Sequence, residues 1–392
     1  MTVSRQPASA FAIAATLATL LAFMQAAASP IPATAPSFIA TIQLPEDGHA
    51  VSVNPLTGQG YVGMTDDLGV FDLDSYQYLN AIQLYSGSGY TIALVAVNAS
   101  TNRLYTGSQV VNLTTNEVAS LPCGGSDIAI NEQTDTIYFG YPTHYHYNPD
   151  YVCVVDGATN SKVTTIEIGY SSYIERVLVA VNPVTNLIYV SYSGDNSLHV
   201  IDGASNTEAT KVPIPHIGDV AVNPATNRIY VVSGNNTIVL DGSTLAELGQ
   251  INGFNCCLLV NPLTNRIYTL STDLKVADGD TNQVVGTLNL PGGVIGPALD
   301  PLRGRIYLAG RYAGWTDKLM VIQDVPAPPT ATGSSPTATA SPTATRTPTS
   351  TWTRTPTATK TSTATSTGTR TPTATITPGT LSNHIYLPYV VR

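Results

Sequence analysis

Short apolar runs that end in a polar turn, each followed by a second apolar run, recur along most of this chain. In the representative stretch Ala221–Tyr230 (AVNPATNRIY), one apolar run ends at Val222 and the next begins at Ile229. The Asn223-Pro224 pair between them favours a turn, because Asn hydrogen-bonds its own backbone and Pro fixes φ. β-branched and aromatic residues on either side favour strands. The pattern predicts hairpins of short β-strands.

The same turn occurs seven times, and each copy has an Asn or Asp that is followed seven residues later by Tyr. These anchor residues are Asn54, Asn98, Asn131, Asn182, Asn223, Asn261 and Asp300. The tyrosines are Tyr61, Tyr105, Tyr138, Tyr189, Tyr230, Tyr268 and Tyr307. The third residue after the anchor is Thr in six copies and Arg303 in the seventh. Successive anchors lie 33 to 51 residues apart, close to the ~40–45 residues of a four-stranded propeller blade.

A second phrase marks another turn in the repeat. It reads VVDGATN, VIDGASN and VLDGSTL around Asp156, Asp202 and Asp241, with looser copies at Asp72 and Asp278. Asp-Gly between β-rich runs is a hairpin signal, so each repeat contains four strands. Seven such sheets bury their faces when they are arranged radially. The sequence therefore predicts an all-β fold, a seven-bladed β-propeller that spans residues 37–324.

The two ends of this region are expected to close the ring. The last repeat has three strands, ending at Leu319–Gln323, and low-complexity sequence follows it. Ser37–Leu44 alternates like a strand and precedes the first anchor. We expect this N-terminal strand to complete the last blade, because ring closure removes open sheet edges.

The repeats resemble those of the Tyr-Val-Thr-Asn (YVTN) seven-bladed β-propeller family, across roughly Phe38 to Asp324. The segments closest to the eponymous tetrapeptide are YVSY at Tyr189–Tyr192 and YVVS at Tyr230–Ser233. The resemblance implies a propeller that is exported or surface-associated and non-catalytic. It implies no particular ligand, because propellers carry many unrelated activities.

The chain begins with a pattern typical of a signal peptide. Residues 1–28 contain Arg5, the apolar run AFAIAATLATLLAF and small residues up to Ala28. These are the charged, apolar and cleavage regions of an export signal. A retained membrane anchor is the alternative, but the run is shorter than the ~20 apolar residues of a spanning helix. We therefore expect an extracellular or cell-surface protein with no transmembrane segment after cleavage.

Beyond the repeats, residues 325–380 consist mainly of Thr, Pro, Ala and Ser. Such a segment buries too little apolar surface to fold, so we expect a disordered, semi-stiff stalk. Residues 381–392 (LSNHIYLPYVVR) form a short apolar tail. The tail is interpreted either as a sorting or attachment signal, or as a frayed end or a strand docked on the propeller.

The charge distribution argues against nucleic-acid binding. The chain has a formal net charge of −9, yet the five charged residues after Asp324 are all basic. The rest therefore holds 12 of the 17 basic residues and all 26 acidic ones. An acidic propeller with scattered Lys and Arg lacks the basic patch that binds nucleic acids.

We call the four strands of each repeat A to D, starting with the strand that ends at the anchor. Candidate ligand-binding residues fall in the inter-blade (D–A) and B–C loops, which share one face around the central channel. The residues that precede the first strands of blades are His49, Asp127, Glu175, His216 and Asp219. The loop GYPTHYHYNPDY adds His144, Tyr145 and His146, and the loop GRYAGWTDK adds Tyr312 and Trp315. Aromatic rings and polar edges together suit a carbohydrate, peptide or protein ligand.

The four cysteines allow more than one interpretation. A disulfide between Cys123 and Cys153 would suit an exported protein, and both are expected near blade 3. Cys256 and Cys257 are adjacent in the predicted strand that leads to Asn261. Two small buried side chains are the simplest reading of this pair, and a vicinal disulfide or a soft-metal site are the alternatives.

No enzyme motif was found in the chain, and its six histidines are few for a metal cluster. Paired carboxylates at Asp72 and Asp278 could hold calcium, but turn formation explains them. We therefore expect an exported, monomeric, non-catalytic binding or display module without a cofactor. The alternatives are an extracellular hydrolase or lyase, or a metal-dependent propeller, with the site on the same face.

Overall fold

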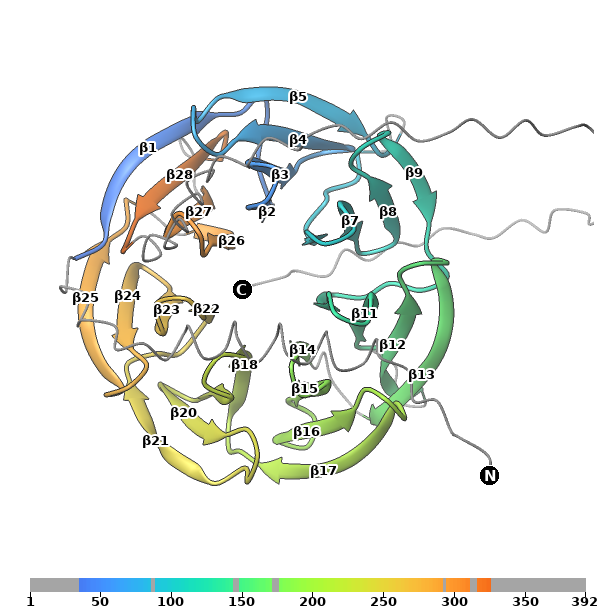
Figure 1. Cartoon of the computed structure of the whole chain (residues 1–392), viewed down its shortest axis with the longest axis vertical. Coiled ribbons are helices and arrows are strands. Elements are labelled where there is room, and N and C mark those ends of the chain that lie inside the picture. The colour runs from blue at the N-terminus through green and yellow to red at the C-terminus, as the bar shows by residue number, and fades with distance from the viewer. Residues whose placement is uncertain are drawn as a thin grey trace, which may run out of the picture. The chain divides into compact units, whose positions relative to one another are not determined.

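The computed structural model describes residues 35–85, 89–143, 148–170, 176–291, 294–310 and 316–325. These residues form 28 strands and no helix, and the strands form seven four-stranded antiparallel sheets. The sheets are arranged as the blades of a closed ring (Figure 1). Strand A of each blade lies innermost and strand D lies at the rim. The predicted all-β, seven-bladed propeller is confirmed.

The strands of blades 1 to 3 are β2 (Ala50–Asn54), β3 (Gln59–Gly63), β4 (Asp67–Asp72), β5 (Tyr78–Gln83), β6 (Val95–Asn98), β7 (Arg103–Thr106), β8 (Gln109–Asn112), β9 (Glu117–Ser120), β10 (Asp127–Asn131), β11 (Thr136–Tyr141), β12 (Asp150–Asp156) and β13 (Ser161–Gly169). Those of blades 4 and 5 are β14 (Val177–Asn182), β15 (Leu187–Tyr192), β16 (Ser197–Asp202), β17 (Thr207–Pro213), β18 (Ile217–Asn223), β19 (Arg228–Ser233), β20 (Asn236–Asp241) and β21 (Glu247–Asn252). Those of blades 6 and 7 are β22 (Leu259–Asn261), β23 (Arg266–Leu270), β24 (Asp273–Asp278), β25 (Gln283–Asn289), β26 (Val294–Asp300), β27 (Arg305–Gly310), β28 (Lys318–Gln323) and β1 (Ser37–Gln43).

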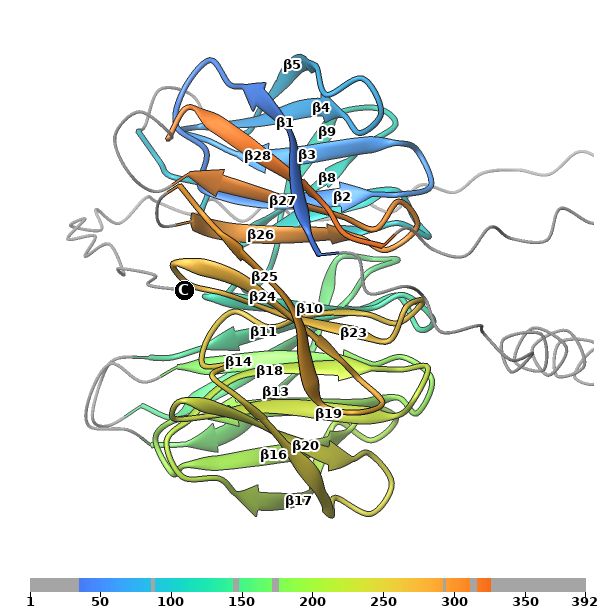
Figure 2. The ribbon, with the colours of Figure 1, turned by 90° about the vertical axis from the view of Figure 1, so that its left-hand side faces the viewer.

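The N-terminal strand closes the ring, as predicted. β1 pairs antiparallel with β28, from Ser37 opposite Gln323 to Gln43 opposite Lys318, and it lies along β28 at the rim (Figure 2). Blade 7 is thus built from both ends of the propeller region, so the outer edge of β28 is covered by a strand.

The seven tyrosines of the repeat form the centre of the hydrophobic core. Each pairs with the strand A residue two positions before its anchor, as Tyr230 pairs with Ala221 in blade 5. Their exposed fractions are at most 1%. The core clusters lie between neighbouring sheets: Tyr138 and Val152 of blade 3, for example, pack with Val177 and Val190 of blade 4. The repeat therefore specifies both the strand register and the packing of adjacent blades.

The anchor residues join each blade to the next at five of the seven interfaces. An anchor Asn uses Oδ1 to accept backbone N–H groups of its own turn, as Asn182 does from Val184 and Thr185. Its Nδ2 donates to the A–B turn of the next blade, as in Asn182 to Asn227 at 2.8 Å. The other four pairs are Asn54–Asn102, Asn98–Asp135, Asn131–Asn186 and Asn223–Asn265, at 2.7–3.0 Å. One side chain thus closes a turn and binds a neighbouring blade.

In the Asp-Gly phrase, the Gly has a different structural role from the predicted one of forming a hairpin turn. The Asp does form the C–D turn, since Asp156 Oδ1 accepts the N–H of Thr159. The Gly, however, leaves room for the acceptor of the inter-blade hydrogen bond. A Cβ at Gly157 would lie 2.3 Å from Asp135 Oδ1, and one at Gly242 would lie 2.4 Å from Asn227 Oδ1. The positive φ of this turn instead falls on residues such as Asn160.

Charged side chains replace the amide contact on both sides of blade 7. Asn261 Nδ2 has no hydrogen-bond partner among the described residues, because Gly304 stands where blades 2 to 6 have Asn or Asp. Blade 6 is joined to blade 7 by Arg266, whose Nη1 donates to Asp324 Oδ1 at 2.6 Å. Tyr268 donates to the other oxygen of Asp324 at 2.7 Å. The Asp324 side chain is fully buried.

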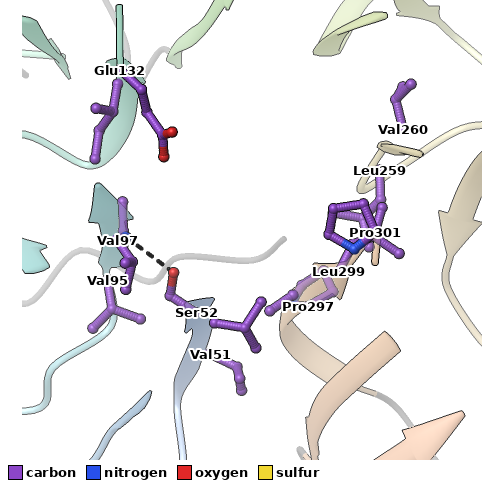
Figure 3. A pocket seen from close by; sticks show the side chains of 14 residues that line it. Val51, Ser52, Val95, Val97, Glu132, Leu259, Val260, Pro297, Leu299 and Pro301 are labelled. Atoms are coloured by element: carbon purple, nitrogen blue, oxygen red, sulfur yellow. Dashed lines mark hydrogen bonds between the residues drawn. The ribbon is translucent and has the colours of Figure 1, made fainter. Parts of the chain in front are cut away.

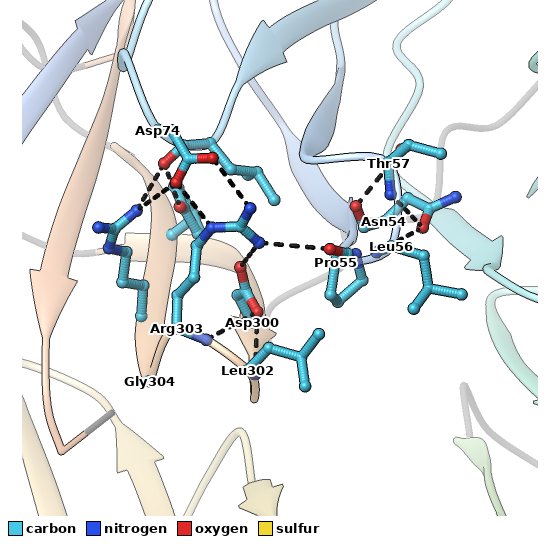
Figure 4. Close-up of polar contacts among 12 residues, drawn as sticks. Asn54, Pro55, Leu56, Thr57, Asp74, Asp300, Leu302, Arg303 and Gly304 are labelled. Atoms are coloured by element: carbon cyan, nitrogen blue, oxygen red, sulfur yellow. Dashed lines mark hydrogen bonds and ion pairs between the residues drawn. The ribbon is translucent and has the colours of Figure 1, made fainter. Parts of the chain in front are cut away.

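Blade 7 is joined to blade 1 through Arg303 (Figure 4). Its Nε and Nη2 donate to the carboxylate of Asp74 at 2.8 and 3.0 Å, and its Nη1 donates to Asp300 at 3.0 Å. The same nitrogen reaches the carbonyl oxygen of Pro55 in blade 1. The hydrogen bonds from Arg303 hold the pKa of Asp74 below its usual range. This bridge connects the first and last repeats of the ring.

Replacement of Asp324 by Ala should destabilise the ring strongly, because it leaves the buried guanidinium of Arg266 without its partner. We expect the free energy of unfolding to fall by about 3–5 kcal/mol, measured by chemical denaturation. Asp273→Ala is the matched control, since Asp273 pairs with Lys275 at 3.9 Å on the surface. Equal stabilities of the two variants would show that the buried pair does not hold blades 6 and 7 together.

Candidate functional site

The two faces of the ring differ in their connections. Strands alternate in direction, so the A–B and C–D turns share one face, and the B–C and D–A connections share the other. We refer to these as the A–B face and the B–C face. Of the predicted site residues, His49, Asp127, His216 and Asp219 lie in the described part of the chain. His144, Tyr145, His146, Glu175, Tyr312 and Trp315 lie outside it.

Asp127 and Asp219 bind the backbone of the next blade. Asp127 Oδ2 accepts the N–H of Val179 at 2.7 Å, and Asp219 Oδ2 accepts the N–H of Leu258 at 2.8 Å. Asp127 is buried, with 6% of its surface exposed. Both stand four residues before their anchor, a shared spacing that is present in the sequence. They lie within β10 and β18, and not before these strands as predicted. Their geometry is that of inter-blade contacts.

The two described histidines precede blades 1 and 5. His49 is half-buried, and this burial lowers the pKa of its imidazole, while nearby Asp47 acts in the opposite direction. His216 is exposed and has a positive φ of 52°, and its N–H donates to Asn196. Within the described ranges, no three His, Cys, Asp or Glu side chains are grouped closely enough to hold a metal ion.

The central channel contains a hollow of about 410 Å³ (Figure 3). Most of its described lining side chains are apolar, such as Val51, Val97 and Leu299 from the innermost strands. Among the described lining residues, Glu132 carries the one charge. Both of its oxygens already accept hydrogen bonds, from the Ala99 N–H and the Ser100 hydroxyl. The described side chains of this hollow therefore offer apolar contacts and one carboxylate that is already hydrogen-bonded.

A second hollow, of about 370 Å³, opens on the B–C face of blade 3. Tyr141, Thr143, Asn148, Pro149 and Tyr151 line it. The two tyrosines are directly opposite each other on β11 and β12, and their rings stack with centroids 4.8 Å apart and an angle of 13°. Burial raises the pKa of the Tyr151 phenol, so this hydroxyl is uncharged at neutral pH. The hollow thus combines an aromatic surface with uncharged polar groups.

The base of this loop is held by a buried carboxylate. Asp150 has no exposed surface, and its Oδ1 accepts the N–H of Thr143 at 2.7 Å. Its Oδ2 accepts the hydroxyl of Tyr192 in blade 4 at 2.8 Å. Tyr192 in turn contacts His199 edge-on, and His199 lies between the carboxylates of Asp195 and Glu208. The tyrosine hollow is therefore fixed to two blades.

The sequence predicted ligand-binding residues in this loop, but it indicated Tyr145 and the two histidines beside it, which lie outside the described residues. The described hollow is formed by the residues at the loop's two ends. The signal was present in GYPTHYHYNPDY, which has a Tyr at the end of one strand and another at the start of the next. Antiparallel pairing of those strands makes the two rings neighbours.

The structure joins Cys123 and Cys153 in a disulfide, with Cα atoms 6.5 Å apart. Cys123 lies in the connection from blade 2, and Cys153 is a buried residue of β12. The bond therefore attaches this inter-blade connection to the sheet that carries the tyrosine hollow. The expected strand position of Cys256 and Cys257 is wrong: β22 begins at Leu259, and Cys257 has a positive φ of 44°. A residue with this φ lies outside a regular strand.

The fold defines the class of this protein: the chain is a seven-bladed β-propeller with a hollow in its central channel and a tyrosine-lined hollow on its B–C face. No protein-family model matches the sequence, and no curated protein is similar to it. In the described portion of the chain, no helix is long and apolar enough to cross a membrane.

Asp127→Ala should lower the free energy of unfolding by about 1–3 kcal/mol, because the buried N–H of Val179 loses its acceptor. Denaturant titration measures this change. His216→Asn is the control, since Asn tolerates a positive φ and the His216 side chain is exposed. An Asp127→Ala variant as stable as the parent would refute the structural role of this carboxylate.

Proposed function

We propose that this chain is exported and acts as a non-catalytic binding and display module, at the cell surface or in the extracellular medium. The observation that carries the proposal is the tyrosine hollow on the B–C face. It presents stacked rings beside uncharged polar groups on a loop whose base is attached to two blades. Pre-organised sites of this kind bind ligands without a large entropic cost of ordering.

Three further observations support an extracellular location. The first 28 residues have the charged, apolar and small-residue regions of an export signal. The Cys123–Cys153 disulfide is of a type that persists in oxidising compartments. A Thr/Pro-rich segment after the propeller would serve as a spacer between the ring and its point of attachment. The repeats themselves support membership of the YVTN propeller family.

The location is tested by expressing the full chain and examining intact cells. We expect antibodies against the propeller to label unpermeabilised cells or the medium, and N-terminal sequencing of the mature protein to begin at Ser29. Leu17→Arg, which places a charge in the apolar run, should keep the protein inside the cell. A protein that retains Met1 and stays intracellular would contradict the proposal.

The binding face is tested separately, with ligands captured by the purified full chain. Tyr151→Ala on the B–C face should abolish capture, whereas Leu56→Ser should leave it intact. Leu56 is 70% exposed and lies in an A–B turn, so it serves as the control for the opposite face. A non-catalytic module should also release its ligand chemically unchanged, as judged by mass spectrometry. Cleavage of the ligand would establish an enzyme instead.

A further inference from the structure

The hollow on blade 3 has features that specify the chemistry of its ligand. The described residues that line it are Tyr141, Thr143, Asn148, Pro149 and Tyr151, and none of these is charged. The Tyr141 ring is 39% exposed, so part of its surface remains available beyond the stack with Tyr151. Asn148 is exposed as well, and its amide is both a donor and an acceptor.

The charges of the described residues favour an uncharged ligand. The described lining offers a cationic ligand no carboxylate, because the nearby Asp150 is fully buried and already hydrogen-bonded. It offers an anionic ligand no cation, and such a ligand would approach a propeller whose acidic residues outnumber its basic ones. The site therefore favours an uncharged ligand, for which shape and hydrogen bonding decide affinity.

The ligand also needs an apolar face and a polar rim. Tyrosine rings provide contact area on their faces and hydroxyl groups at their edges. A pyranose matches this pattern, because its axial C–H groups form apolar patches and its hydroxyl groups lie around the ring. A volume of about 370 Å³ lies within the ~300–1,000 Å³ range of small-molecule sites.

We propose that the hollow of Tyr141, Thr143, Asn148, Pro149 and Tyr151 binds a neutral pyranose unit of an oligosaccharide. The sugar stacks one C–H face on the exposed part of the tyrosine pair and hydrogen-bonds the Asn148 amide. The Thr143 hydroxyl already donates to the Asn148 carbonyl oxygen at 3.0 Å, so this hydroxyl holds the two ends of the loop together and does not bind the sugar. This inference rests on the proposed binding function and names its ligand.

A proline-rich peptide is the competing ligand, because aromatic grooves also bind polyproline II helices. Such peptides lie across several aromatic ridges and between them. Here the two rings are stacked parallel to each other, which gives one platform instead of a row of ridges. The geometry therefore favours a single sugar ring over an extended peptide.

The test uses the purified full chain and a panel of immobilised probes. Neutral gluco-, xylo-, manno-, galacto- and N-acetylglucosamine oligomers are compared with an oligouronate and with a synthetic peptide of residues 341–356. Hits are then titrated by calorimetry. We expect one or more neutral oligomers to bind, with an affinity that changes little between low and high salt because no ion pair forms.

Tyr141→Ala should weaken that binding about tenfold, the loss expected when a central aromatic contact is removed. Tyr141→Phe should keep most of the affinity, since the ring remains. Asn148→Ala is a second variant at an exposed position, and it should weaken binding without affecting the fold. The control is Tyr90→Ala: Tyr90 is 42% exposed and stacks on Tyr85, but it does not line the hollow.

The inference is overturned if no neutral oligomer binds, or if binding survives both Tyr141→Ala and Asn148→Ala. It is also overturned if the oligouronate or the peptide binds there in place of neutral sugars. If the oligouronate or the peptide binds there, the site still binds a ligand. The proposed binding function would then stand, and only the assignment to a neutral sugar would be refuted. A chain that stays inside the cell and binds no ligand would contradict both the proposed function and the sugar assignment.

Discussion

The buried amide of the anchor Asn is the contact on which this propeller depends. Its oxygen closes the A–B turn of one blade, and its nitrogen binds the corresponding turn of the next blade, as in Asn182 and Asn227. Because an unpaired buried polar group is costly, the turn and the blade interface must form together. The repeated phrase that stands out in the sequence is therefore an assembly element. The tyrosine hollow, which is the proposed ligand site, lies on the opposite face.

Blade 7 departs from this rule where the chain must close on itself. Gly304 cannot accept the Asn261 amide, and Arg266 with Asp324 provides the contact instead. On the other side, Arg303 bridges Asp300 and Asp74. Charged pairs are more specific than amide pairs, because a wrong partner leaves a charge uncompensated. These charged contacts set the two interfaces of blade 7 apart from the five interfaces that use the anchor amide.

Much of the fold could be predicted because its determinants are local and repeated. The anchor-to-Tyr spacing predicts the strand register, and the missing fourth strand of the last repeat predicts closure by β1. The space-making role of Gly157 could not be predicted, since it concerns the side chain of Asp135 in a different turn. The acceptor role of Asp127 could not be predicted either, because it involves the backbone of Val179 in another blade. The local pattern shows which residues recur, but not which residue of the next blade each one contacts.

The candidate site depends on the same construction. Asp150 and Tyr192 attach the base of the tyrosine hollow to two blades, and those blades belong to the closed ring. Hydrogen exchange measured on the full chain tests this account most directly. We predict that the amides of β28, and those of β1 that are hydrogen-bonded to β28, exchange only by global unfolding, as slowly as those of β15 in blade 4. Exchange of β1 through a lower-energy opening, with the other blades still protected, would contradict the claim that the closing strand and blade contacts form one cooperative ring.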